Sequence, residues 1–377
     1  MTDRNLKTVV AMEKCSGYQP EELREALQRC FHPFGGAGAF ISRGDRVLLK
    51  PNMLSAKAPE RAITTHPEII SSMAEIVRDL GATPVIGDSP GGVLRGVERV
   101  WNNTGIRDMA KKNDIELVSF EAAGSEEIDS GGYRFYVARP VLEADRVINL
   151  AKLKTHTLTL LTAAVKNMFG VVPGFRKSVL HKMYPKPKEF AEMLVELYSV
   201  VRPDFSIVDA VLAMEGNGPS SGEPAWLNLL LAGEDAVAID AVSASVIGYK
   251  PGVIDSTRIA GEKGVGISVL DDIHRTGSGA GFRAEGFELT SNTGLRMIPD
   301  FLVKLVKPLV WIRPEIDPAV CTGCRLCEKS CPVKVISYDG EVCEIDSSGC
   351  VNCMCCHELC PENAVEVRMS RLARMIS

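Results

Sequence analysis

The sequence predicts an α/β protein with a mostly parallel sheet covered by helices on both faces, followed by a small cysteine-rich domain. Strand-like apolar segments alternate with segments of helical periodicity over most of residues 47–247, which is typical of parallel strands joined by helices. Ten of the 12 cysteines lie between residues 321 and 360. We therefore expect an α/β domain over residues 1–295, a linker helix over 296–312 and a second domain over 313–377.

The first βαβ unit is visible near the start of the chain. Residues 47–52 form an apolar segment that is interrupted by Pro51. Thr65 and Glu68 fit a capping box, and the apolar spacing that follows predicts a helix with one buried face. This helix should end at Gly81, and residues 84–87 should form the next strand.

The alternation continues towards residue 300. We expect helices over residues 93–111, 188–201 and 236–247, the last one capped by Asp235 and ended by Gly248. We expect strands over residues 116–120, 146–150, 205–211 and 227–231, and one near 286–289 in an otherwise irregular glycine-rich segment. The tail after residue 370 predicts a short surface helix.

Bulk properties exclude several classes of function. The net charge of −5 argues against a general nucleic-acid binder. No stretch of about 18 apolar residues predicts a transmembrane segment, and the first residues lack the apolar core of a signal peptide. The glycine patterns of standard dinucleotide and nucleoside-triphosphate sites are also missing. A cytoplasmic protein is the expectation.

Two cysteine runs, at residues 321–332 and 350–361, share the spacing C-x2-C-x2-C-x3-C-P. This is the ligand run of bacterial ferredoxins, in which four thiolates hold a [4Fe–4S] cube and the fourth cysteine of each run ligates the other cluster. We therefore expect a small α+β ferredoxin-like domain with two [4Fe–4S] clusters. The predicted ligand sets are Cys321, Cys324, Cys327 and Cys360 for one cluster, and Cys350, Cys353, Cys356 and Cys331 for the other.

Disulfides or zinc are the alternatives for these cysteines. Disulfides need an oxidising compartment, and zinc sites usually show two separated C-x2-C pairs; two complete runs favour clusters. Cys343 and Cys355 lie outside the pattern. Cys343, in an expected strand, is interpreted as a small core residue. Cys355 is either a neighbouring thiol or an alternative ligand, and we favour the first.

Polar residues or glycines follow five of the predicted strands. Ligands of open parallel sheets bind beyond the carboxyl ends of the strands. The polar residues and glycines after the five strands should therefore meet at one edge of the sheet. Gly233 and Asp235, which follow the strand at 227–231, are among them. The candidate substrate-binding residues are Lys50, Asn52, Asp88, Ser89, Lys152, Lys154, Asn167, His181, Glu215 and Asn217.

The segment from residue 152 to residue 181 is strongly basic, although the protein is acidic overall. Such a cluster favours an anionic ligand. Lys166 and His156 are the candidate catalytic residues, with His156 as a proton carrier. The alternative is a solvated basic face with capping histidines. His66 is interpreted as a helix-start residue, and Ser89 lacks a His–Asp partnership that would indicate a hydrolase.

Six segments together resemble the family known as domain of unknown function 362: residues 47–54, 64–70, 87–92, 152–174 with His181, 207–219 and 233–241. Members of this family often carry a ferredoxin module. The resemblance implies an iron–sulfur protein with a redox role. A fainter similarity to the lactate-racemase family, which uses a nickel-pincer nucleotide, rests on the basic glycine-containing segment before His181 and supplies no nickel ligands.

Three functions fit these observations. The first is a ferredoxin-dependent oxidoreductase that passes electrons to or from an anionic substrate or cofactor at the strand ends. The second is an electron-transfer or adaptor protein that docks a redox partner, and the third is a cofactor or metal-centre maturation protein. The expected partners are a redox protein or a small-molecule electron donor or acceptor, and an anionic small molecule.

Overall fold

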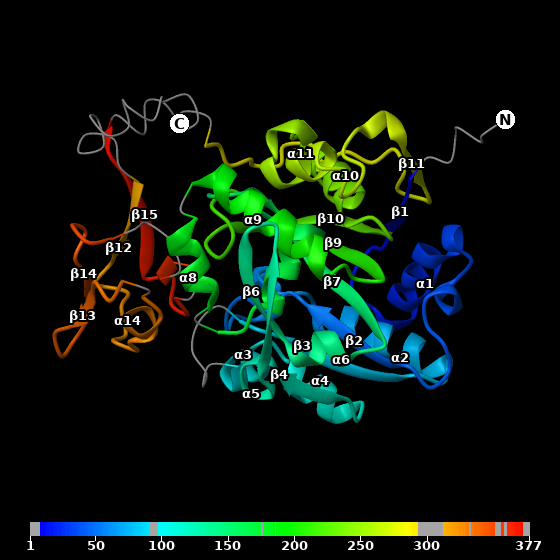
Figure 1. Ribbon diagram of the computed structural model, residues 1–377, viewed down its shortest axis with the longest axis horizontal. Helices are drawn as coiled ribbons and strands as arrows, with labels where there is room; N and C mark the ends of the chain where they lie inside the picture. Colours follow the sequence, from blue (N-terminus) through cyan, green and yellow to red (C-terminus); the bar gives the residue numbers. More distant parts are fainter. Residues whose placement is uncertain are drawn as a thin grey trace.

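A computed structural model describes residues 8–90, 97–174, 176–184, 186–292, 312–331, 333–350, 356–357 and 360–371 (Figure 1). The predicted linker helix lies outside these residues except for residue 312, as does most of the predicted C-terminal helix. Cys353 and Cys355 also lie outside them.

A nine-stranded sheet forms the centre of the α/β domain, with the strand order β11-β1-β10-β9-β7-β2-β3-β4. The strands are β11 (Ile273–Thr276), β1 (Thr8–Lys14), β10 (Glu223–Gly233), β9 (Phe205–Glu215), β7 (Arg146–His156), β2 (Arg46–Pro51), β3 (Thr83–Asp88) and β4 (Glu116–Ser119), with β8 (Leu160–Thr162) paired to β7. All pairings are parallel except those of β10 with β1 and β9 and that of β8 with β7. The predicted mostly parallel sheet is confirmed.

The reversed direction of β10 corrects one expectation about the strand ends. Because β10 runs antiparallel to β9, its carboxyl end lies at the opposite edge of the sheet from those of β2, β3, β7 and β9. Gly233 and Asp235 are therefore far from the other strand-end residues. Four of the five predicted strand ends therefore meet at the edge where a ligand is expected.

Helices cover both faces of the sheet, as predicted. One apolar core contains α1 (Pro20–Phe31), α2 (Pro67–Asp79), α3 (Val97–Asn103) and α4 (Ile106–Lys112). The core on the other face contains α7 (Ala164–Asn167), α9 (Pro187–Val200), α10 (Ala236–Ile247) and α11 (Asp255–Glu262). The segment between β4 and β7 forms α5 (Phe120–Ala123), the hairpin of β5 (Ser125–Ser130) and β6 (Tyr133–Ala138), and α6 (Arg139–Glu143).

Three local expectations are wrong. The helix over 93–111 is split into α3 and α4, because Gly105 adopts a left-handed backbone with a φ of 75°. Thr65 does not cap α2: its hydroxyl donates to the carbonyl of Leu150, and His66 Nδ1 accepts the Glu68 amide instead. No strand forms at 286–289, where Glu288 bonds the loop after β9.

The strand at 146–150 extends much further than predicted. β7 continues to His156, and β9 continues to Glu215. Lys152 and Lys154 consequently lie inside a buried strand, where both side chains are almost inaccessible to solvent. In contrast, α10 has the predicted bounds, the predicted Asp235 cap and the predicted end at Gly248.

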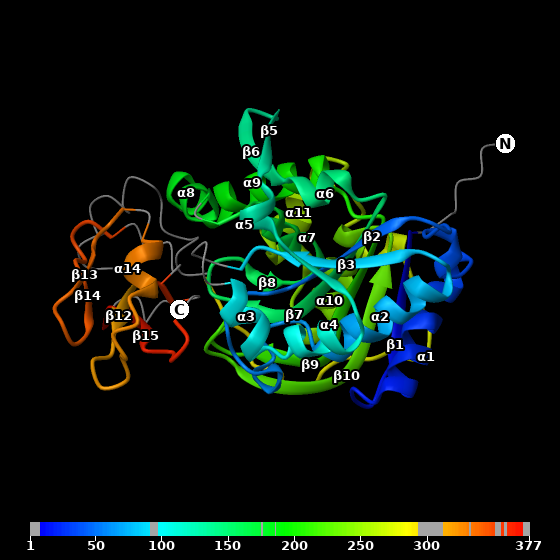
Figure 2. The ribbon, with the colours of Figure 1, turned by 90° about the horizontal axis from the view of Figure 1, so that it is seen from below.

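The C-terminal domain is small and lies at one end of the molecule (Figures 1 and 2). β12 (Ile312–Ile316) pairs antiparallel with β15 (Val365–Met369), and β13 (Ile336–Tyr338) with β14 (Cys343–Ile345). The helix α14 (Leu326–Ser330) begins just after Cys324 and contains Cys327, the third cysteine of the run. A contact to the α/β domain joins Glu362 to Arg99 of α3, with 4.0 Å between the charged atoms. Within the described parts of the chain, no helix has the length and apolar character needed to cross a membrane.

Asp240 on α10 holds the start of α7. Its carboxylate accepts the backbone N–H groups of Ala164 at 2.6 Å and Val165 at 3.2 Å. Burial raises the pKa of Asp240 to about 7, although these hydrogen bonds oppose the shift. Since the ordinary value is 3.8, this group favours folding most strongly below that pH, and the contribution is lost as the pH rises to about 7.

Replacing Asp240 with Asn should remove this component of the pH dependence. Between about pH 5 and about pH 8, the free energy of unfolding of the wild type should fall relative to that of Asp240→Asn. Each pKa unit corresponds to roughly 1.4 kcal/mol. Urea unfolding of both proteins at the two pH values measures the difference. An equal pH dependence in the two proteins would contradict the assignment.

Candidate functional site

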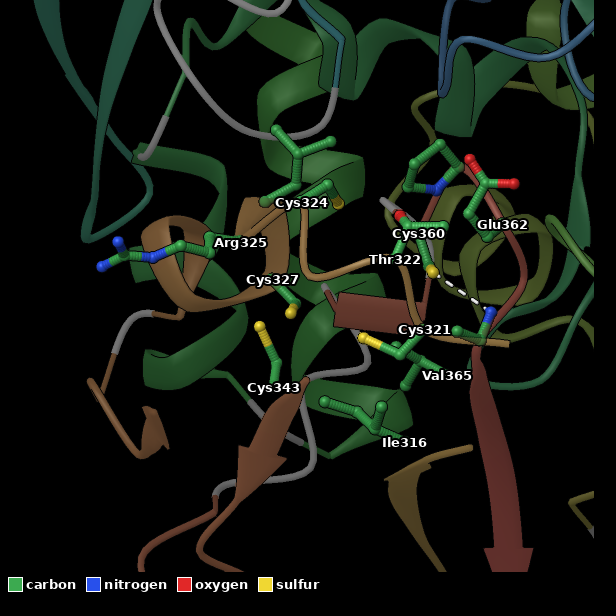
Figure 3. A pocket seen from close by; sticks show the side chains of 13 residues that line it. Ile316, Cys321, Thr322, Cys324, Arg325, Cys327, Cys343, Cys360, Glu362 and Val365 are labelled. Carbon is green, nitrogen blue, oxygen red and sulfur yellow. Dashed lines mark hydrogen bonds between the residues drawn. The ribbon is translucent and has the colours of Figure 1, made fainter. Parts of the chain in front are cut away.

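Four cysteines of one predicted ligand set line a single open cavity of about 330 Å³ in the C-terminal domain (Figure 3). Cys321 and Cys324 lie in the loop after β12, Cys327 is in α14, and Cys360 comes from the second run. The chain thus brings Cys360 to the first three cysteines across more than 30 residues of sequence. Cys343 of β14 is a fifth cysteine in the lining of the cavity.

The donor set and its surroundings fit an iron–sulfur cube. Soft thiolates are its usual ligands, and a backbone amide donates to one sulfur of each predicted ligand set. The Ala364 amide donates to Cys360 Sγ at 3.1 Å, and the Val335 amide donates to Cys331 Sγ at 3.4 Å. Such donors stabilise a negatively charged sulfur. Among the residues with a described position, no three potential ligands are close enough to share a single metal ion.

The second predicted set is described in part. Cys356 is buried, and Cys331 and Cys350 are half-buried, whereas Cys353 lies outside the described residues. The two clusters and their crossed ligands therefore remain a prediction.

A buried ion pair lies at the strand ends of the α/β domain. Lys50 Nζ of β2 is 2.8 Å from Asp88 Oδ1 of β3, and the two side chains are 0% and 4% exposed. The Met53 amide donates to the other carboxylate oxygen at 2.8 Å. Burial lowers the pKa of Lys50 and raises that of Asp88, and each charge offsets part of the effect on the other.

The short 3₁₀ helix from Met168 to Val171 covers this ion pair. A Cβ atom at Gly170 would clash with Asp88 Oδ1 and with Lys50 Nζ. Only glycine lets the backbone pass so close to both charges. The carbonyl of Gly170 also accepts the Ser89 amide at 3.3 Å, which ties the cover to the end of β3.

A chain of amide side chains runs beside the ion pair. Asn52 Nδ2 donates to Asn167 Oδ1 at 2.9 Å, and Asn167 Nδ2 donates to Asn149 Oδ1 at 2.7 Å. Lys154 Nζ donates to Asn52 Oδ1 at 2.9 Å and to the carbonyl of Ile63 at 2.6 Å. The structure therefore brings together Lys50, Asn52, Asp88, Lys154 and Asn167, as the sequence predicts.

Ser89 is the centre of a second polar cluster. Its hydroxyl is bonded to Lys177, to Glu121 and to the Gly174 amide. Lys177 also donates to the carbonyls of Ser89 and Pro90. These bonds fasten the end of β3 to α8 (Arg176–Met183), which gives Ser89 a structural reason to be buried.

Lys152 points to the opposite face of the sheet from Lys50. Its Nζ is 2.8 Å from Asp209 Oδ2 of β9, and both side chains are fully buried. Tyr18 donates to Asp209 Oδ1 at 2.9 Å, and its ring stacks on His66 with 3.6 Å between the ring centres. Burial lowers the pKa of His66 to about 4, so His66 is neutral near pH 7.

Sequence reasoning missed Tyr18 and Asp209 and did not connect His66 to them. Asp209 offered a signal, because a carboxylate inside an apolar strand needs a buried partner. Tyr18 offered none, since it precedes α1 and meets Asp209 only through the fold. Lys152, predicted to bind an anion, is instead fully buried and paired with Asp209 in this cluster.

The other predicted residues lie at the same edge with different surroundings. His156 is buried, and its Nδ1 accepts the amides of Leu158 and Thr159. His181 stacks on Phe190, with ring centres 4.4 Å apart. Lys166 is half-buried at the end of α7. Glu215 accepts the Glu288 amide at 2.8 Å, and Asn217 is exposed in the loop after β9.

Two of the solved structures that this chain resembles show only weak likeness to it. A Thermotoga maritima protein is 12% identical with a TM-score of 0.36, over 56% of this chain and 54% of that one. The lactate racemase apoprotein from Thermoanaerobacterium thermosaccharolyticum is 11% identical with a TM-score of 0.38, over 62% of this chain and 55% of that one. The matched part therefore spans about half the length of each of these proteins.

Comparisons of sequence are more specific. A thylakoid-associated protein from Synechocystis sp. is 38% identical over 248 residues, which are 65% of this chain and 76% of that protein. The 4Fe-4S binding domain family matches residues 314–337, which contain the first cysteine run. The family described as Domain of unknown function (DUF362) matches residues 47–245. The chain belongs to the DUF362 family, and it carries a 4Fe-4S binding domain after its DUF362 domain.

Proposed function

We propose that this protein transfers electrons through two [4Fe–4S] clusters, to or from an anionic ligand held by the α/β domain. The observation that carries the proposal is the cavity lined by Cys321, Cys324, Cys327 and Cys360. These residues would hold the first cluster, and Cys331, Cys350, Cys353 and Cys356 would hold the second. When bound, such cubes accept and donate single electrons at potentials that their surroundings set.

The first cluster site has one side towards solvent and one towards the α/β domain. Cys324 is exposed, so a redox partner can approach the cavity from that side. Glu362, which lines the cavity beside Cys360, contacts Arg99 of α3. α3 lies in the same βαβ region as Asp88 and Ser89. This placement supports electron exchange between the first cluster and the strand-end edge of the α/β domain.

The anionic ligand is proposed to bind where the buried amide chain reaches the surface. Asn167 and Lys154 are buried, whereas Asn52 and Lys166, the neighbour of Asn167 in α7, are half-buried. An ammonium group and an amide side by side recognise a carboxylate or a phosphate by charge-assisted hydrogen bonds. The buried pair of Lys50 and Asp88 holds this edge rigid but is itself too enclosed to be the first contact.

A role as an adaptor is the second candidate, and one observation favours it. Val179 and Met183 on α8 are 49% and 57% exposed, although both are apolar. Figures 1 and 2 place α8 on the side of the α/β domain that faces the C-terminal domain. An apolar surface of this kind can dock a redox enzyme. In that case the α/β domain binds a protein and retains no small molecule.

Two double variants test the crossed ligand sets. Cys324→Ala/Cys360→Ala removes two thiols from one predicted set and should leave one cluster, with about half of the wild-type iron. Cys324→Ala/Cys331→Ala removes one thiol from each set and should leave no stable cluster. Iron and acid-labile sulfide in anaerobically purified protein measure the outcome, with circular dichroism as the control for folding. The reverse pattern would show that each run binds its own cluster, and a wild type with one cluster would refute the proposal of two.

Lys166→Met tests the anion site. Anaerobically purified wild type should retain a small anion, which mass spectrometry identifies after denaturation. The variant should bind the anion at least about tenfold more weakly, since a hydrogen bond to a charged group contributes roughly 1.5–3 kcal/mol. Lys111→Met, at an exposed position on α4, is the matched control and should bind as the wild type does. Equal retention by Lys166→Met would refute this site, and a wild type that co-purifies with a redox enzyme but retains no anion would establish the adaptor role.

A further inference from the structure

Five described cysteines line the cavity of the predicted first cluster, and Cys343 is the one that is not a predicted ligand. It lies at the start of β14 and is 2% exposed. Its side chain lies beside that of Cys327, a predicted ligand of the first cluster. Figure 3 shows the two sulfur atoms next to each other, with Cys321 on the same side of the cavity. A residue that merely fills the small core would not need to direct a sulfur atom at a ligand.

We propose that Cys343 is a positioning residue that donates an S–H···S hydrogen bond to Cys327 and thereby raises the reduction potential of the first cluster. The inference rests on the proposed cluster site and deepens it. With a cluster bound, Cys327 is a thiolate and has no proton to donate. The proton of the hydrogen bond must then belong to Cys343, whose thiol is a donor, though a weak one.

The surroundings of Cys343 hold its sulfur in place. β14 pairs with β13 through Ile336, Ser337 and Tyr338, which fixes the position of the Cys343 backbone. On the other side, the backbone of Arg325 lies close to the Cys343 sulfur. Arg325 has a left-handed backbone with a φ of 59° at the start of α14, so its amide and the Cys327 side chain belong to the same tight turn.

The direction of the effect follows from charge. Reduction adds an electron to a cluster whose ligands are already negative. A hydrogen bond to a ligand sulfur withdraws charge from that sulfur and stabilises the reduced state more than the oxidised state, which raises the potential. Removing the donor should therefore lower the potential of the first cluster and leave the second cluster unchanged.

Potentiometric titration followed by electron paramagnetic resonance tests this assignment on the full-length, anaerobically purified protein. In Cys343→Ala, one of the two clusters should be at least threefold harder to reduce, a shift of about 30 mV for a one-electron couple. The second cluster is an internal reference in the same sample. Cys343→Ser keeps a donor of similar size and should recover a large part of the shift. Ile336→Val alters the same small core without removing a thiol, and should leave both potentials unchanged.

The outcomes are distinguishable. Unchanged potentials in Cys343→Ala, or an equal shift in Ile336→Val, would overturn the assignment while leaving the two clusters in place. Loss of one cluster's iron in both Cys343→Ala and Cys343→Ser would overturn it in another way, because Cys343 would then be a ligand. A wild type without two clusters would refute the proposed function itself, which the iron content of that sample shows before any titration begins.

Discussion

The buried ion pair between Lys50 and Asp88 is the constraint on which the strand-end edge of the α/β domain depends. Two charges with almost no access to solvent are tolerable only when they meet each other and have further hydrogen bonds. This requirement fixes β2 beside β3 in register, draws the Met53 amide to the carboxylate and leaves only glycine possible at position 170. The amide chain from Asn52 to Asn149 lies beside this pair, and Asn167 Nδ2 donates to the Lys50 carbonyl at 3.3 Å.

The C-terminal domain depends on a different interaction. Its apolar core is small and consists largely of cysteines and a few aliphatic side chains. A domain of this size buries too little apolar surface to be stable on that account alone. Bonds from thiolates to iron would join the loop after β12, the helix α14 and the residues just before β15. Among the described residues of this domain, the strand pairings are those of β12 with β15 and of β13 with β14, and both are short. Cluster binding and folding of this domain should therefore be coupled.

Much of the fold could be predicted because local signals agreed with the tertiary structure. In α10, an aspartate cap, an apolar helix and a terminal glycine all point to the same bounds. β7 was harder: Lys152 and Lys154 look like the end of a strand, and the strand continues only because Asp209 and the carbonyl of Ile63 neutralise or bind them inside the protein. The reversed direction of β10 could also have been predicted, because residues 216–222 between β9 and β10 are too few to form the crossover helix that a parallel pair needs.

The candidate site was likewise predictable in part. The ligand spacing of the cysteines specifies their chemistry without any knowledge of the fold, and the structure places one complete set around one cavity. The polar strand-end residues were predictable as a group, because parallel strands end together. Their individual partners were not, because pairs such as Tyr18 with Asp209, or Cys343 with Cys327, form between distant parts of the sequence.

The proposal of two clusters and a bound anion is tested most directly by diffraction at the iron absorption edge from anaerobically grown crystals. It predicts two cubic clusters, the first bound by Cys321, Cys324, Cys327 and Cys360 on the side of the C-terminal domain that faces α3. It also predicts a bound anion beside Lys166 and Asn52. A single cluster, a mononuclear metal in the cavity, or a first cluster on the side remote from the α/β domain would contradict it.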